Sequence, residues 1–268
     1  MWSTISRDSS SNLVAGPTKF PNGMKSLADK IHGMGLKFGL YADSGTKTCS
    51  GYPGSQGYET QDAKQLTAWG VDYWKYDNCN TPSGNSQPRY ATMRDALLAT
   101  NSKILYSLCN WGADSVWAWE SQVGNSWRVG GDITNTWSSV ASTAASNASI
   151  TSYAASGGFN NYDMIEIGNG GLTATERAHF GLWAICKSPL ILGMDLTKIS
   201  SSLLSIIKNK VNTRPLTRRE SAALTQYQPL TKTLCLRVTL RDHDNVPYGL
   251  AVWLVFFACR SNSNVFSL

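Results

Sequence analysis

Two aspartates, Asp77 and Asp132, each come at the end of a segment with the composition of a buried strand. Two carboxyl groups that face each other can hydrolyse a glycosidic bond, because one attacks the anomeric carbon while the other protonates the leaving oxygen. In an enzyme that retains configuration the two groups stand roughly 5 to 5.5 Å apart. The pair is therefore the first candidate for catalysis.

A cation precedes each of these acids at an even spacing, Lys75 before Asp77 and Arg128 before Asp132. Side chains alternate along a strand, so each cation is predicted to share a face with its acid. A neighbouring cation favours the ionised carboxylate, which suits a nucleophile. Taken alone, Lys75 and Asp77 could equally be a surface ion pair on an edge strand, with little energetic weight.

The strand endings recur along the chain. Four predicted strands finish in a polar or acidic residue, and they cover residues 36–43, 70–79, 103–110 and 126–132. Two further predicted strands cover 163–168 and 190–195. Segments with helical period alternate with them, at 24–34, 60–69, 90–100, 140–148, 173–187 and 200–208.

This alternation of strand and helix predicts a parallel sheet, either a closed barrel or an open doubly wound sheet. In a barrel the active-site residues come from the carboxyl ends of many strands, whereas an open sheet concentrates them at one point, often beside a glycine-rich loop. Polar endings here occur on four strands, and no GxGxxG motif follows the first strand. The pattern favours a barrel.

Composition supports a globular chain. Of 268 residues, 42% are hydrophobic and 10 are Trp, which predicts a substantial core. The net charge of +6 could suggest nucleic-acid binding, but 9 of the 24 basic and only 3 of the 18 acidic residues lie from Lys208 onward. Residues 1–207 are therefore neutral overall, and we expect no nucleic-acid partner.

The cysteines and histidines do not suggest a metal site. Six cysteines form no CxxC pair, and none of the three histidines ends a predicted strand. A metal-dependent barrel enzyme is accordingly disfavoured. Cys49 and Cys79 each follow the end of a neighbouring predicted strand, and the pattern fits a disulfide as well as it fits two free thiols.

Signals for the compartment are few. The chain shows no apolar leader after Met1, and the apolar stretch 249–259 is too short to span a bilayer, so we expect no membrane association. The sequon at Asn147 weakly favours secretion.

Several strings match one known family. They are Lys19-Phe20-Pro21-Asn22-Gly23-Met24, Gly35 to Asp43, Lys47-Thr48-Cys49, Lys75-Tyr76-Asp77-Asn78-Cys79, Ser107-Leu108-Cys109-Asn110-Trp111-Gly112, Trp127-Arg128 through Asp132-Ile133, and Glu166-Ile167-Gly168-Asn169. The chain resembles, from about Trp2 to Lys210, the melibiase-type α-galactosidases of glycoside hydrolase family twenty-seven, especially fungal ones.

The resemblance implies a retaining exo-α-galactosidase that releases terminal galactose from oligosaccharides of the melibiose or raffinose type. Asp77 would be the nucleophile and Asp132 the acid/base, with no metal or cofactor. Positions that match substrate contacts and the pocket loop are Lys75, Arg128, Tyr41, Cys109, Asn110 and Trp111. Cys49 and Cys79 match a family disulfide, and the family is typically extracellular.

The resemblance also implies a (β/α)8 TIM-type barrel followed by a β-sandwich. Compared with that pattern, residues 1–207 would form a barrel without its first two strands, which would leave unpaired sheet edges. Residues 208–268 form a basic tail that does not resemble the sandwich. Alternatives are an α-N-acetylgalactosaminidase of the same family, or an inactive fragment that is a galactose-binding remnant. The oligomeric state is not predicted.

Overall fold

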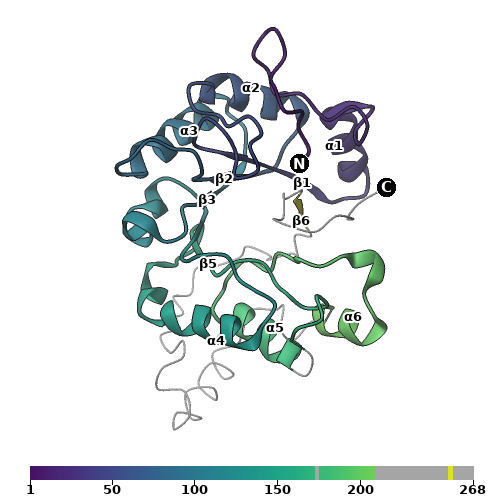
Figure 1. Cartoon of the computed structure of the whole chain (residues 1–268), viewed down its shortest axis with the longest axis vertical. Coiled ribbons are helices and arrows are strands. Elements are labelled where there is room, and N and C mark those ends of the chain that lie inside the picture. Colours follow the sequence, from purple (N-terminus) through teal and green to yellow (C-terminus); the bar gives the residue numbers. More distant parts are fainter. Residues whose placement is uncertain (173–174, 209–252, 256–268) are drawn as a thin grey trace. The chain divides into compact units, whose positions relative to one another are not determined.

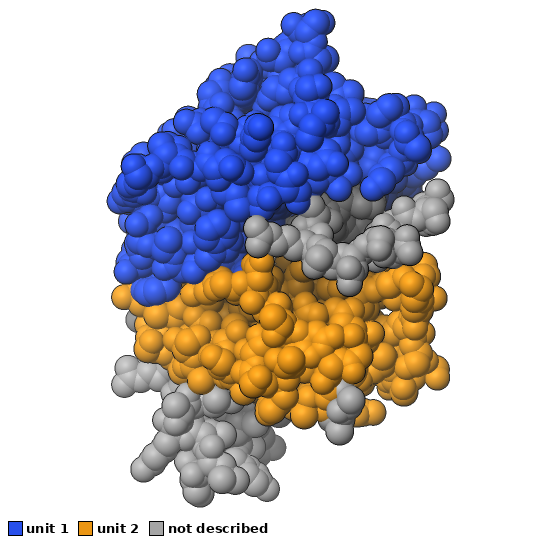
Figure 2. Space-filling view, viewed as in Figure 1, with its two compact units in different colours: residues 1–128, 251–268 blue, residues 129–250 orange. Residues whose placement is uncertain are grey.

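The structure is a computed structural model, and it describes residues 1–172, 175–208 and 253–255. The chain divides into two compact units, drawn in blue and orange in Figure 2. The first unit comprises Met1–Arg128 with Ala251–Leu268, and the second Val129–Leu250.

The first unit contains a parallel sheet. Its strands are β1 (Lys37–Asp43), β2 (Tyr73–Asp77), β3 (Leu105–Cys109), β4 (Ser126–Arg128) and β6 (Trp253–Val255), in the spatial order β4-β3-β2-β1-β6. The intervening helices are α1 (Gly23–Gly33), α2 (Glu59–Trp69) and α3 (Gln87–Ala99), followed by short 3-10 helices η1 (Ala113–Ala118) and η2 (Glu120–Gln122). Figure 1 shows α1, α2 and α3 beside these strands.

Helices cover one face of the sheet, so the strands are apolar on that side. Trp74 and Tyr76 of β2 are fully buried, and the Tyr76 ring packs edge-on against Tyr90 of α3 at a centroid distance of 5.7 Å. Tyr76 also contacts Tyr106 of the neighbouring strand at 5.8 Å. These rings fill the layer between sheet and helices, and this is the packing expected for a parallel sheet with covered faces.

The turn from α2 into β2 has a local cause. Gly70 adopts a left-handed φ of 77° and its N–H bonds to Leu66 and Thr67 carbonyls, which ends the helix. Val71 N then bonds to Leu66 O, and Asp72 N reaches Phe38 O at 2.8 Å to start the pairing of β2 with β1. The short connection sets the strand register, in which Asp43 lies opposite Asp77.

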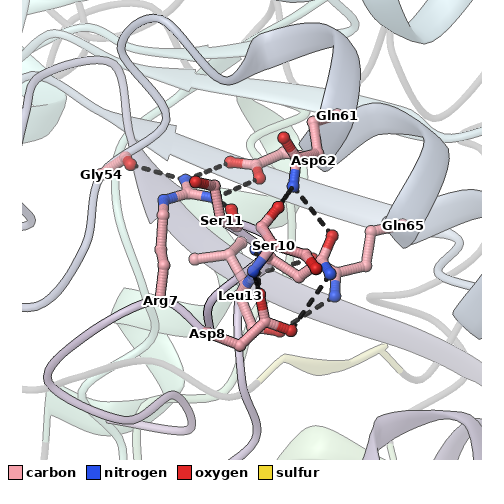
Figure 3. A network of polar contacts seen from close by, with 10 residues as sticks. Arg7, Asp8, Ser10, Ser11, Leu13, Gly54, Gln61, Asp62 and Gln65 are labelled. Atoms are coloured by element: carbon pink, nitrogen blue, oxygen red, sulfur yellow. Dashed lines mark hydrogen bonds and ion pairs between the residues drawn. The ribbon is translucent and has the colours of Figure 1, made fainter.

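The N-terminal segment is tied to α2 by polar contacts (Figure 3). The Arg7 guanidinium donates to both carboxylate oxygens of Asp62, each at 2.7 Å, and to the carbonyl of Gly54 at 2.8 Å. The Gln65 side chain bonds to both backbone groups of Leu13. Arg7 therefore connects the segment before α1, the β1–α2 loop and α2.

The second unit contains α4 (Trp137–Ser146), η3 (Ala148–Tyr153), β5 (Phe159–Asn161), α5 (Glu176–Ile185), η5 (Leu196–Lys198) and α6 (Ser201–Ile207). Side chains cap three of these helices, with Thr136 accepting from Ser139 N, Asp195 from Thr197 N and Ser200 from Leu203 N. None of the helices in the described ranges is long and apolar enough to cross a membrane.

All six predicted helices are present, with ends shifted by a few residues. The predicted strands at 163–168 and 190–195 are wrong, because only an isolated parallel bridge joins Ile165 and Leu192. Asp163 has a φ of 88°, which interrupts extended backbone, and the strand of this region is β5 just before it.

The sequon side chain is buried. Asn147 is 3% exposed and its Nδ2 donates to Thr143 O at 2.7 Å. In this conformation the amide is engaged inside the fold, so the sequon gives no support for glycosylation of the folded chain.

Most of the predicted basic tail, residues 208–268, lies outside the described residues. Its described strand, β6, pairs in parallel with β1, with Phe38 opposite Leu254. The sequence predicted an unpaired edge where strands are missing, but the β1 edge is paired along Lys37 to Gly39.

Candidate active site

The candidate residues gather at the carboxyl ends of the parallel strands of the first unit. Asp43, Asp77 and Cys109 lie side by side in register, and two residues earlier on each strand Tyr41, Lys75 and Ser107 do the same. Residues in one register row of a parallel sheet present their side chains to one face. The predicted shared face of Lys75 and Asp77 follows directly, on the side opposite Trp74 and Tyr76.

The Asp77 carboxylate is held from several directions. It is 7% exposed; Oδ2 accepts from the Tyr41 hydroxyl at 2.8 Å and Oδ1 accepts from Asn78 N at 3.0 Å. Each oxygen thus has a donor that fixes the plane of the carboxylate. A carboxylate oriented in this way is suited to attack on an electrophilic carbon.

Tyr41 is kept as a hydrogen-bond donor by its surroundings. Burial raises the pKa of its hydroxyl far above the ordinary value, and the negative charges of Asp77 and Asp43 raise it further. The phenol therefore stays protonated over the whole physiological range. Lys75 Nζ lies over the same ring, 6.0 Å from its centroid.

Cys49 and Cys79 form a disulfide, with a Cα–Cα distance of 5.1 Å. The sulfur of Cys49 lies 3.4 Å from Asp77 Oδ2, so the bond packs directly against the carboxylate. Asp43 lies close to both sulfurs, and together these three residues have the spacing of a metal site. Because both sulfurs are in the disulfide, they offer no thiolate to a cation.

Cys109 and Arg128 form the adjoining part of the site. Cys109 is buried next to Asp77, and Arg128 Nη1 lies 3.9 Å from its sulfur. Arg128 ends β4 and is 2% exposed. A buried guanidinium at a strand end is positioned to bind a polar ligand group.

The loop after β3 is shaped by Asn110. Its Nδ2 donates to Ser86 Oγ at 3.1 Å and to Ala113 O at 2.9 Å, while Oδ1 has no hydrogen-bond partner among the described residues. Trp111 follows with a φ of 60° and remains 38% exposed. Asn110 thus braces the loop, and Trp111 is partly exposed to solvent.

Asp132 belongs to the second unit and its side chain is exposed. The predicted strand 126–132 is too long, because β4 ends at Arg128 and Asp132 lies in the loop that follows. The strand-parity argument that placed Arg128 and Asp132 on one face therefore does not apply. The next residue, Ile133, is anchored through its N–H to the buried Asp163 carboxylate at 2.9 Å.

Sequence reasoning did not include Asp43 among the site residues. Its side chain is fully buried and accepts from the backbone N–H groups of Gly45 and Cys79. The sequence signal that singled out Asp77 was also present for Asp43, since both are acidic residues at the end of a strand.

Comparisons with known proteins find one family over most of the chain. The family model described as Alpha galactosidase A matches residues 1–214. Alpha-galactosidase 3 of Arabidopsis thaliana is 48% identical over 220 residues, which cover 80% of this chain and 50% of the relative. The chain thus spans about half the length of this relative.

Solved structures show the same similarity. Alpha-galactosidase I from Mortierella vinacea superposes with a TM-score of 0.74 at 42% identity, covering 79% of this chain and 60% of that one. The Saccharomyces cerevisiae α-galactosidase solved with raffinose gives a TM-score of 0.74 at 39% identity, with 76% and 51% covered. The parallel sheet described above is accordingly part of a (β/α) barrel.

Proposed function

Because this chain belongs to the α-galactosidase family whose model matches residues 1–214, we propose that it acts as a retaining exo-α-galactosidase. The observation that carries the proposal is the Asp77 carboxylate, which is oriented by Tyr41 at the carboxyl end of a parallel strand. Active sites of such barrels lie at this end of the strands.

In the first step, Asp77 attacks the anomeric carbon and the bond to the leaving oxygen breaks, while Asp132 gives that oxygen a proton. In the second step, water attacks the galactosyl–Asp77 ester as Asp132 removes its proton, and the carboxylate is released. Two inversions restore the starting configuration. No metal or cofactor takes part in the proposed reaction.

Side chains around Asp77 would bind the sugar. Lys75 and Arg128 can donate to sugar hydroxyl groups, and Cys109 would line the floor between them. The exposed ring of Trp111 can stack on an apolar sugar face, whereas Asn110 would contribute through its Oδ1 and by shaping the loop. Tyr41 would act mainly through Asp77.

The substrate would be an α-galactoside oligosaccharide, because the matching relatives are named α-galactosidases and one was solved with raffinose. An α-N-acetylgalactosaminide is the alternative substrate, and a galactose-binding remnant is the non-catalytic alternative. The Cys49–Cys79 disulfide supports an oxidising, extracellular compartment.

The nucleophile is tested by kinetics of the purified chain with an aryl α-galactoside. Asp77→Asn should lower kcat at least ~10³-fold, because the variant cannot form the ester intermediate. Asp72→Asn is the matched control, since Asp72 lies just before the opposite end of the same strand. Equal turnover of Asp77→Asn and the wild-type chain would show that the assignment is wrong.

The acid/base is tested by comparing leaving groups. Asp132→Asn should slow hydrolysis of raffinose far more than hydrolysis of a nitrophenyl α-galactoside, because the nitrophenolate leaves without protonation. An equal loss on both substrates would contradict the role of Asp132. Parallel assays with the N-acetylgalactosaminide distinguish the alternative substrate, and ligand-induced thermal stabilisation without turnover would indicate the binding remnant.

A further inference from the structure

The buried carboxyl group of Asp43 joins the two loops that flank Asp77. Its Oδ1 accepts from Gly45 N at 2.8 Å and its Oδ2 accepts from Cys79 N at 2.9 Å. Gly45 belongs to the loop after β1, and Cys79 to the loop after β2. Because both oxygens are used, one side chain fixes the separation of the two loops.

These loops have no room to shift independently. Ser44 N donates to Asp77 O at 2.9 Å, and Ser55 N donates to Asp43 O at 2.9 Å. A Cβ added to Gly45 would collide with the backbone oxygen of Cys79, and one added to Gly54 would collide with that of Gly45. Backbone therefore packs on backbone, and a movement at Asp43 is transmitted to the neighbouring loop.

The same contacts place the disulfide. Cys79 is held through its N–H by Asp43, and the Cys49 sulfur bonded to it lies 3.8 Å from Asp43 Oδ2 and 3.4 Å from Asp77 Oδ2. The sulfur thus lies against the carboxyl groups of both acids. Since it carries no proton, it acts as a packing surface and not as a donor.

We propose that Asp43 is a positioning residue for Asp77, because its carboxyl group joins the two loops and so holds the Cys49–Cys79 disulfide against the Asp77 side chain. The expected effect on kcat rests on the proposed function, because it requires that the chain hydrolyses a galactoside. The proposal assigns to Asp43 no contact with the sugar.

The charge state of Asp43 is compatible with this role. Burial and, to a lesser extent, the negative charge of Asp77 raise its pKa to about 8, against the opposing effect of the two backbone N–H groups and Arg89. Tyr41, which donates its hydroxyl proton to Asp77, stays protonated. At neutral pH the Asp43 carboxyl is therefore mostly uncharged and does not repel the Asp77 carboxylate.

Asp43→Asn tests the proposal, because the amide keeps the shape but presents N–H where one oxygen accepted a bond. We expect kcat to fall at least ~10-fold with KM within about 2-fold, and a phosphine to reduce the Cys49–Cys79 disulfide at least ~10-fold faster. If Asp43 only stabilised the fold, its replacement would lower stability without lowering kcat at a nearly unchanged KM.

Asp72→Asn is the matched control. The Asp72 carboxylate also accepts a hydrogen bond from a backbone N–H group, that of Phe38 at 2.9 Å, but it does so at the opposite end of the same strands. It should lower the unfolding midpoint without changing kcat or disulfide reduction. If Asp43→Asn behaves like Asp72→Asn in both measurements, the proposal is overturned.

The experiment distinguishes a failure of the proposed function from a failure of the positioning role of Asp43. If the wild-type chain hydrolyses no α-galactoside, the reduction rates of the disulfide still decide the positioning role. If Asp43→Asn does not fold, amide exchange in the wild-type chain decides it. The Gly45 and Cys79 amides should exchange as slowly as those in the middle of β2, and exchange at the rate of an open loop would overturn the proposal.

Discussion

At the residue scale, the site depends on side chains whose surroundings fix their protonation and direction. Tyr41 donates to Asp77 because burial keeps the phenol protonated. Asp43 fills the adjacent position as a mostly neutral carboxyl. Neighbouring acids can lie side by side in this way when only one of them is charged.

Glu120 is a second buried acid, and it lies outside the site. It is 0% exposed, and neither of its carboxylate oxygens has a hydrogen-bond partner among the described residues. Burial raises its pKa well above the ordinary value. The folded chain therefore retains a proton at Glu120 that the unfolded chain releases near pH 4.5.

This linkage predicts the sign of a pH effect. A raised pKa stabilises the folded state most at low pH, and the stabilisation declines as the pH rises from the unfolded toward the folded pKa. Glu120→Gln should be more stable than wild type at neutral pH, and between pH 5 and 7 its unfolding free energy should fall less steeply, by up to about 1.4 kcal/mol per pH unit.

Urea unfolding at a series of pH values measures this difference. Asp95→Asn is the control, because the Asp95 side chain is 65% exposed and should leave the slope as in wild type. Identical slopes for wild type and Glu120→Gln would contradict the prediction.

At the element scale, the buried Arg7–Asp62 pair ties the N-terminal segment to α2 (Figure 3). The side chains are only 10% and 0% exposed, and Arg7 also stacks over the Tyr58 ring at 4.1 Å. Removing one partner of a buried pair leaves an uncompensated charge. Asp62→Asn should therefore lower the unfolding free energy by about 3–5 kcal/mol.

The exposed pair Lys25–Asp29 on α1 provides the comparison. Its side chains are 59% and 57% exposed, so Asp29→Asn should change stability by no more than about 0.5 kcal/mol. Thermal or urea unfolding of both variants measures the contrast. Similar small losses would mean that the Arg7–Asp62 pair does not hold the segment in place.

At the scale of the whole molecule, β6 covers the edge of β1. An uncovered parallel strand exposes unpaired N–H and C=O groups, which promote association with other chains. Leu254→Pro should remove one ladder donor opposite Phe38, lower stability by about 1–2 kcal/mol and increase aggregation.

Light scattering at matched concentrations checks this prediction. Asn262→Pro lies outside the bounds of β6 and serves as the control for a proline in the same part of the chain. Equal scattering of the two variants would count against a protective role of β6.

The sequence by itself determined the features that depend on local patterns. Helical period located the six predicted helices, and strand alternation gave the shared face of Lys75 and Asp77 at the end of β2, because alternation along a strand is a property of the backbone. The motif resemblance pointed to the family and to the Cys49–Cys79 disulfide, and both were confirmed.

Only the tertiary structure decided what depends on contacts between distant segments. The bracing of Asn110 by Ser86 and the burial of Asp43 between two loops both depend on residues far apart in sequence. The spacing of Cys49 and Cys79, without the family resemblance, likewise left disulfide and free thiols open until the fold placed the two sulfurs together. The early end of β4 and the break at Asp163 were likewise missed, because apolar composition favours a strand while backbone geometry and neighbouring contacts end it.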